Sequence, residues 1–276
     1  MTQSLARDRF YQEIQQPDDA INLAAAALYI AQEEYPELDC GSYLHQLDRM
    51  ALQLRDRLPE ETYPLKILKA ISTYLFEAQG FMGNSQNYYD PRNSFLNQVL
   101  DRRTGIPITL SLVYLELARR IGFPMAGVSM PGHFLIRPTL DEMAIFVDPF
   151  HKGEIMFEED CQDRIRKFYG VDVRLRPDHF EPIGPRPFLS RILMNLKVIY
   201  LQQQDIPRAF AAIDRILLIT PDALAERRDR GILYYRQGQL DEAREDLKYY
   251  LLNHPDARDS FEIQQVVSQI NQILQD

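Results

Sequence analysis

The stretch GIPITLSLVYLELARRIGFPMAGVSMPGHFLIRPTLDEMAIFVDPF, residues 105–149, decides the fold. Its first part, Leu110–Ile121, is apolar nearly all round, which predicts a buried helix rather than an amphipathic one. Three runs rich in β-branched or aromatic residues follow between turn signals, at Met125–Met130, His133–Arg137 and Met143–Asp148. The sequence therefore predicts a buried helix followed by strands, with His133 opening one strand and Asp148 closing another.

Further helices are predicted on both sides of this stretch. Upstream, Ala20–Ala31 is rich in Ala and Leu, the best helix formers, and apolar residues recur at helical spacing in Tyr43–Leu58 and Leu65–Phe76. Downstream, Glu158–Tyr169 is predicted to be a helix that covers the sheet. Four prolines then fall within eleven residues, at positions 177, 182, 185 and 187, which predicts an extended and stiff linker.

The C-terminal part contains an internal repeat with an offset of 34 residues. Three pairs show it: Tyr200 and Tyr234, Ala209 and Ala243, and Pro221 and Pro255. This period is typical of tetratricopeptide repeats, which are pairs of helices that stack into a solenoid. Gly231 provides the close helix packing in the second repeat, whereas Lys197 stands at that place in the first. Ser260–Leu274 is predicted to be a capping helix.

Composition excludes several classes of function. The net charge is −9 without any run rich in Lys or Arg, which argues against nucleic acid as a partner. No apolar run is long enough for a membrane span, and the N-terminal residues lack the apolar core of a signal peptide. Two cysteines in 276 residues indicate no disulfide framework and favour a reduced, cytoplasmic setting. The five histidines show no paired spacing, so no metal site and no cofactor are predicted.

With these features together, the chain resembles the bacterial SirB-type transglutaminase-like proteins with tetratricopeptide repeats. The segments that carry the resemblance are YYDPRNSFLNQVLDRRTGIPITLSLVYLELARRIGFP, PGHFLIRP, VDPF, RILMNLKVIY and RDRGILYYRQGQLDEAREDL. The resemblance implies an α+β fold with a transglutaminase-like, papain-like core, N-terminal helices before it and an α-helical solenoid after it. The expected parts are 1–84 (helices packed on the core), 85–175 (core), 176–187 (Pro-rich linker) and 188–276 (repeats and cap).

The resemblance also implies a catalytic pattern that this chain does not complete. A transglutaminase core has a cysteine at the start of its central helix, then a histidine and then Asp-Pro. Here His133 and Asp148-Pro149 match the last two places, and the two side chains are expected to touch. Pro107 occupies the place of the nucleophile. A remnant His-Asp pair without its thiol is therefore expected.

Other residues are candidate nucleophiles or candidate ligand contacts. Thr109 and Ser111 follow Pro107, but a hydroxyl needs a well-placed base, and Thr109 suits capping of the helix. Cys40 and Cys161 lie in segments predicted to be helical, away from the site. Residues expected to bind a ligand are Asn93, Arg102, Arg103 and Thr109. The two arginines could hold a carboxylate or a peptide C-terminus, or they could be a solvated pair.

Three functions remain open from the sequence. The first is a non-catalytic or degenerate transglutaminase-like protein that binds a peptide or protein partner through its cleft and its repeats. The alternative is a hydrolase or acyl transferase that acts on amide or ester bonds with a nucleophile other than residue 107. The third is a scaffold that uses only the repeats, although two repeats could equally serve to buttress the core.

Overall fold

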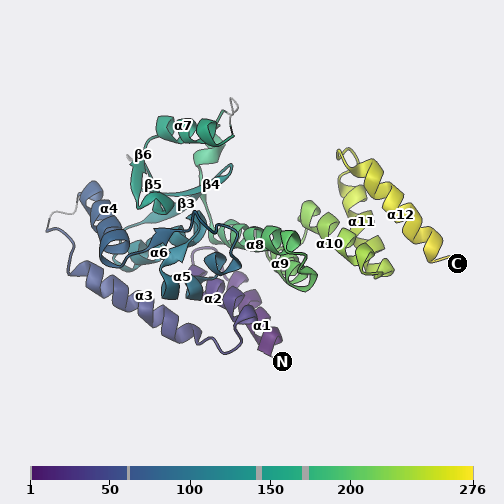
Figure 1. The fold of residues 1–276 in the computed structure, drawn as a ribbon, viewed down its shortest axis with the longest axis horizontal. Helices are drawn as coiled ribbons and strands as arrows, with labels where there is room; N and C mark the ends of the chain where they lie inside the picture. Colours follow the sequence, from purple (N-terminus) through teal and green to yellow (C-terminus); the bar gives the residue numbers. More distant parts are fainter. Residues whose placement is uncertain (1, 61–62, 141–144, 170–173, 276) are drawn as a thin grey trace. The chain divides into compact units, whose positions relative to one another are not determined.

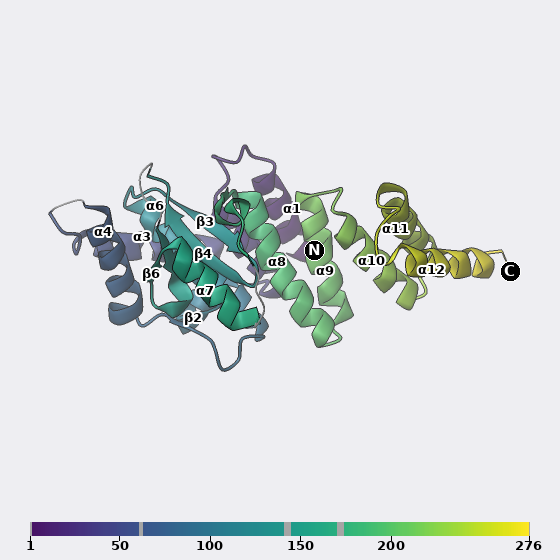
Figure 2. The same cartoon turned by 90° about the horizontal axis from the view of Figure 1, so that it is seen from above.

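The computed structural model describes residues 2–60, 63–140, 145–169 and 174–275, which form two compact units (Figures 1 and 2). The first unit is Met1–Ile192 and the second is Leu193–Asp276. The predicted N-terminal helices and the predicted core thus belong to one compact unit. None of the helices described is long and apolar enough to cross a membrane.

The first unit combines helices with a small sheet, as predicted for an α+β fold. Its helices are α1 (Thr2–Ile14), α2 (Leu23–Glu34), α3 (Cys40–Arg55), α4 (Pro64–Ser72), α5 (Leu96–Arg102), α6 (Pro107–Arg120), α7 (Glu158–Tyr169) and the start of α8 (Pro185–Gln202), with a π-helix at Thr73–Ala78 and 3-10 turns at Pro91–Ser94, Pro149–His151 and Pro177–Phe180. Its strands are β1 (Met82–Gly83), β2 (Thr104–Gly105), β3 (Met125–Met130), β4 (His133–Pro138), β5 (Phe146–Asp148), β6 (Glu154–Met156) and β7 (Pro182–Ile183).

Five strands form an antiparallel sheet in the order β6-β5-β4-β3-β7. The three predicted runs correspond to β3, β4 and β5, and Met143 and Ala144 of the third run lie outside the described residues. β6 and β7 were not predicted, because each is a short segment of two or three residues without a clear alternation of its own. β1 and β2 form a separate parallel pair.

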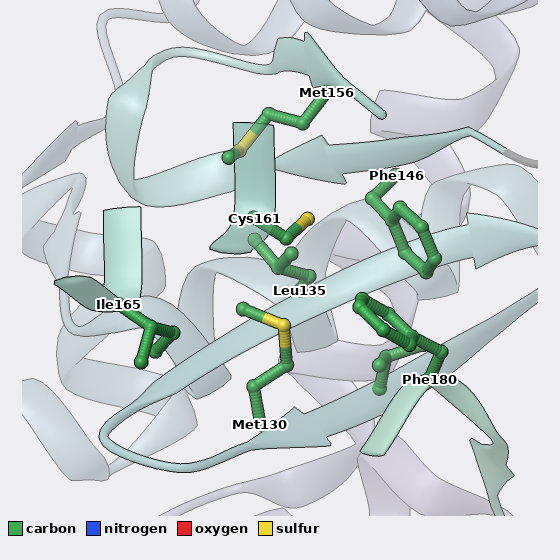
Figure 3. Close-up of a cluster of buried hydrophobic side chains, with 8 residues drawn as sticks. Met130, Leu135, Phe146, Met156, Cys161, Ile165 and Phe180 are labelled. Atoms are coloured by element: carbon green, nitrogen blue, oxygen red, sulfur yellow. The ribbon is translucent and has the colours of Figure 1, made fainter. Parts of the chain in front are cut away.

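The two faces of the sheet are covered by different helices. Val128, Leu135 and Phe146 point toward α7 and pack with its residues Cys161 and Ile165, in the buried cluster drawn in Figure 3. On the other face, Phe134 meets Phe188 of α8 with ring centroids 4.9 Å apart, and α6 lies against β3 and β4. The α7 cluster holds side chains from four strands, so it fixes the sheet in one register.

The segment predicted as a linker is built into the first unit. Pro182 pairs with Val128 of β3, and α8 begins at Pro185. Proline is tolerated at both places, because an edge strand leaves one side of its backbone unpaired and the first turn of a helix needs no donor. The division between the two units falls after Ile192, within α8.

The second unit consists of paired helices, as the 34-residue period predicted. After the end of α8 come α9 (Ile206–Ile219), α10 (Leu224–Arg236), α11 (Leu240–Asn253) and α12 (Ser260–Ile273). Ala243 and Leu247 of α11 are fully buried, and Ile263, Val267 and Ile270 of α12 pack with them. A Cβ atom at Gly231 would lie 2.7 Å from the side chain of Leu247, which explains the glycine at this close contact.

Lys197 replaces this glycine in the first repeat and makes a buried ion pair instead. Its Nζ donates hydrogen bonds to Glu226 Oε2 at 2.7 Å and to Asp229 Oδ2 at 2.8 Å, both on α10. Burial by itself would lower the pKa of Lys197, but the hydrogen bonds that it donates to the Asp229 and Glu226 carboxylates outweigh burial and raise this pKa. The lysine therefore stays charged and ties α8 to the next repeat.

Replacing Lys197 by Met is expected to loosen the repeats. The change leaves the buried Glu226 carboxylate without its cation, which costs about 3–5 kcal/mol in comparable buried pairs. Hydrogen exchange of the α10 amides, followed by mass spectrometry, measures this loss. The matched control is Lys248→Met on α11, where the lysine is exposed and exchange should stay within error of the natural chain. Equal exchange in the two variants would contradict a structural role of Lys197.

Candidate functional site

The register of the sheet brings His133 and Asp148 to one face. Ile136 of β4 pairs with Val147 of β5, so His133 and Asp148 both project from the opposite face, where α7 lies. His133 Nε2 lies 2.7 Å from Asp148 Oδ2, which confirms the predicted contact. The other ring nitrogen of His133, Nδ1, has no hydrogen-bond partner among the described residues.

The Asp148 carboxylate is wholly buried and surrounded by nitrogen atoms. Its Oδ1 accepts hydrogen bonds from the backbone N–H groups of Phe150 (3.0 Å) and His151 (3.3 Å). Burial alone would raise the pKa of Asp148, but the hydrogen bonds from His133 and His151 outweigh burial and hold that pKa well below its ordinary value. Asp148 is therefore a fixed negative charge at the floor of the site.

Two residues of this cluster were not found from the sequence. His151 Nδ1 lies 2.8 Å from Asp148 Oδ2, and Arg164 of α7 makes an ion pair with the same oxygen. The signal for His151 was available, because Asp148-Pro149 starts a 3-10 turn and a residue three places after its cap folds back over the aspartate. Arg164 gave no signal, since only the packing of α7 on the sheet brings it to Asp148.

A cavity of about 950 Å³ opens above this cluster. His133, His151 and Arg164 line it together with an aromatic wall of Tyr88, Tyr89 and Phe150. The rings of this wall are in contact, with centroid separations of 5.4 Å for the two tyrosines and 6.1 Å from Tyr88 to Phe150. Gly83 makes room for the wall, because a Cβ atom there would lie 2.6 Å from the Phe150 ring.

Pro107, the first residue of α6, also lines the cavity. Its fixed backbone angle suits the first helical position, where no hydrogen-bond donor is needed. Within the described part of the chain, the cavity wall contains one serine, Ser85, and no threonine or cysteine. Ser85 makes no hydrogen bond to His133 in that part, so no hydroxyl there is paired with an imidazole base.

The other candidate nucleophiles are engaged elsewhere. Thr109 is fully buried, and its Oγ1 donates to Asn93 O (2.6 Å) and accepts from the N–H of Ile106 (3.1 Å), as expected for a residue that caps the helix. Ser111 is buried without a hydrogen-bond partner among the described residues. Cys161 lies in the α7 cluster, where burial raises its pKa to about 12, and Cys40 is buried in α3.

The residues expected to bind a ligand have partners within the protein. Asn93 is fully buried, and its Nδ2 donates to the carbonyl oxygens of Asn87 (2.8 Å) and Tyr88 (3.2 Å). Arg102 donates to Asp90, and Arg103 donates to the carbonyl oxygen of Gln79 at 2.6 Å. None of the four lines the cavity.

This geometry favours a supporting role for all four, in place of the predicted ligand contacts. Asn93 and Thr109 hold the 84–90 loop against the start of α6, and the loop presents the tyrosines of the aromatic wall. Sequence patterns could not separate the two roles, because a buried asparagine and a ligand-binding one have the same local signature in a loop.

Replacing Asn93 by Ala is expected to free the 84–90 loop. The change removes the donors to Asn87 and Tyr88 and leaves buried carbonyl groups unpaired, at a cost of about 1–3 kcal/mol. Hydrogen exchange of peptides that cover the loop should accelerate. Asn87→Ala is the matched control, since this side chain is exposed in the same loop. Loss of ligand binding without faster exchange would return Asn93 to the role of a ligand contact.

Comparison with known proteins agrees with this architecture. Residues 41–194 match the transglutaminase-like superfamily, and residues 196–268 match the tetratricopeptide repeat. A UPF0162 protein of Xylella fastidiosa is 40% identical over 242 residues, which cover 86% of each chain. A UPF0162 protein of Vibrio cholerae is 30% identical over 238 residues, with 86% of this chain and 88% of that protein covered.

A more distant similarity reaches a human protein. F-box only protein 21 of Homo sapiens is 27% identical over 259 residues, which cover 82% of this chain and 40% of that protein. No solved structure matches the chain. With its transglutaminase-like unit, its tetratricopeptide repeats and its extensive similarity to the bacterial relatives, the chain belongs to the UPF0162, or SirB-like, family of the transglutaminase-like superfamily.

Proposed function

We propose that this protein is a degenerate transglutaminase-like protein that binds a peptide segment of a partner in the His133 cavity without turning it over. The observation that carries the proposal is Pro107, which lines the cavity at the start of α6, where active members of the superfamily carry the thiol. A helix start beside an imidazole is a good place for a thiolate, but proline offers no nucleophile.

The cavity wall supports a peptide as the occupant. The cavity volume of about 950 Å³ would hold several side chains. Tyr88, Tyr89 and Phe150 provide apolar surface, and His133 and His151 provide polar groups with which a backbone amide could form hydrogen bonds. Tyrosine is enriched among the residues that contribute most of the binding energy at protein interfaces.

The tetratricopeptide repeats support protein binding independently of the cavity. Such repeats commonly take up extended segments or helices of other proteins on their concave face. Residues 196–268 match this repeat, and this match supports the proposed binding of a protein. We expect a cytoplasmic setting, as the two buried, unpaired cysteines suggest.

Replacing Pro107 by Cys is expected to restore a reactive thiol. At the first position of α6 the helix dipole stabilises a thiolate, and the His133 imidazole, which lines the same cavity, is expected to add to this stabilisation. Alkylation by iodoacetamide at pH 6 should be at least about tenfold faster in Pro107→Cys than in the double variant Pro107→Cys, His133→Ala. The natural chain is the control, because its two cysteines are buried. Equal rates in the two variants would show that position 107 does not face His133.

Replacing Tyr89 by Ala is expected to weaken peptide binding. Peptides selected from a random twelve-residue display library against the full chain should lose at least about tenfold in affinity, because Tyr89 is 56% exposed on the cavity wall. Tyr63→Ala is the matched control, since Tyr63 is 59% exposed and lies outside the wall. Equal affinities in the two variants would place the peptide site elsewhere.

Absence of turnover is the second part of the same test. The full chain is incubated with fluorogenic casein, with p-nitrophenyl acetate and with a fluorescent amine plus casein as transamidation substrates. Rates should equal those of buffer. His45→Ala is the control, because His45 is an exposed histidine of α3. Turnover that is lost in His133→Ala and kept in His45→Ala would contradict the proposal and favour the hydrolase or acyl transferase.

A further inference from the structure

The groups around Asp148 form a ligand set for a metal ion. A ring nitrogen of His133, a carboxylate oxygen of Asp148 and a ring nitrogen of His151 all lie within 4.8 Å of one another. Two imidazole nitrogens and one carboxylate oxygen bind Zn²⁺ and other divalent transition metals in many proteins, with a further position left open. We propose that His133, Asp148 and His151 bind a divalent ion of the Zn²⁺ or Co²⁺ type at the floor of the cavity.

The scaffold holds these ligands with little freedom. His133 and Asp148 stand on neighbouring strands, and His151 lies in a turn whose backbone N–H is bound by Asp148 Oδ1. This leaves Oδ2 as the oxygen for an ion, while Oδ1 keeps its two backbone bonds as outer support. With metal bonds of about 2.0–2.2 Å, tetrahedral ligands stand roughly 3.4 Å apart. The present contacts of 2.7 and 2.8 Å to Oδ2 would need to open by about 0.6–0.7 Å.

Two neighbours of His151 favour opposite protonation of its Nδ1 atom. Its Nδ1 is 2.8 Å from Asp148 Oδ2, which favours a proton on that nitrogen. The same Nδ1 is 3.0 Å from Nη1 of Arg164, which favours a free lone pair. A neutral imidazole satisfies one neighbour only. A metal ion would take the lone pair of Nδ1 and bind Oδ2 at the same time.

Arg164 is the competitor of the ion, and it has a second partner to which it can withdraw. Its Nη1 pairs with Asp148 Oδ2, and its Nη2 donates to Glu154 Oε2 at 2.6 Å. Glu154 stands directly opposite Asp148 in the β5–β6 register, so the guanidinium can keep this carboxylate when it leaves the other. The positive charge of Arg164 nevertheless repels a cation, and its removal should raise the affinity of the site for metal.

The test is a Co²⁺ titration of the full chain without a histidine tag, followed by visible absorption, with Zn²⁺ added last to displace Co²⁺. We expect one Co²⁺ per chain. His151→Ala should weaken binding at least about tenfold. Arg164→Gln should strengthen it at least about tenfold, because a competing cation is removed. His254→Ala is the matched control, since this histidine is exposed in the second unit, and its titration should equal that of the natural chain.

The outcomes separate cleanly from those of peptide binding, because no peptide is present. Co²⁺ binding that survives His151→Ala unchanged would overturn the proposal, and so would binding seen only in Arg164→Gln. The His151 side chain is 49% exposed, so its replacement should leave the far-UV circular dichroism unchanged. His151→Ala therefore tests the ligand set without unfolding the protein.

Discussion

The site of the first unit depends on the hydrogen bonds and the ion pair made by one buried carboxylate at the end of β5. Asp148 is fully buried, and its two oxygens divide their partners: backbone N–H groups on Oδ1, and His133, His151 and Arg164 on Oδ2. An ionised group in this position is tolerated only because each oxygen is surrounded by donors. The same carboxylate caps the following turn. Asp148 therefore determines both the path of the chain from β5 to β6 and the charge at the floor of the cavity.

The course of the central helix and strands could be predicted because their signals are local. An apolar helix that ends at Gly122-Phe123-Pro124 and β-rich runs between turns fix α6, β3 and β4, and the strand register then brings His133 to Asp148. The edges were missed, since β6 and β7 exist only through pairing with their neighbours. The Pro-rich segment was predicted to be a linker, but prolines fit an edge strand and a helix start as well as a linker.

The site itself was predictable in part. The His133–Asp148 pair follows from chain order, whereas Arg164 depends on how a helix packs over the sheet, and this depends on long-range contacts that no local pattern encodes. The repeats show the converse case. Their period is visible in the sequence, but the compensation at Lys197 is not, because the acidic partners lie on the next helix pair. Gly231 allows close helix packing in the second repeat, whereas in the first repeat Lys197 makes a buried ion pair with α10 of the next helix pair.

The bond between Thr109 and the Asn93 carbonyl has a consequence for the kinetics of association. It fastens the loop with the two wall tyrosines to the first turn of the central helix, and Asn93 adds two further bonds to the loop backbone. The rim of the cavity is thus ordered before any ligand arrives, and no loop has to fold upon encounter. A peptide that binds in the cavity, as proposed, would cost the protein little conformational entropy, and its association rate would be set by diffusion and orientation instead of by a slow opening of the protein.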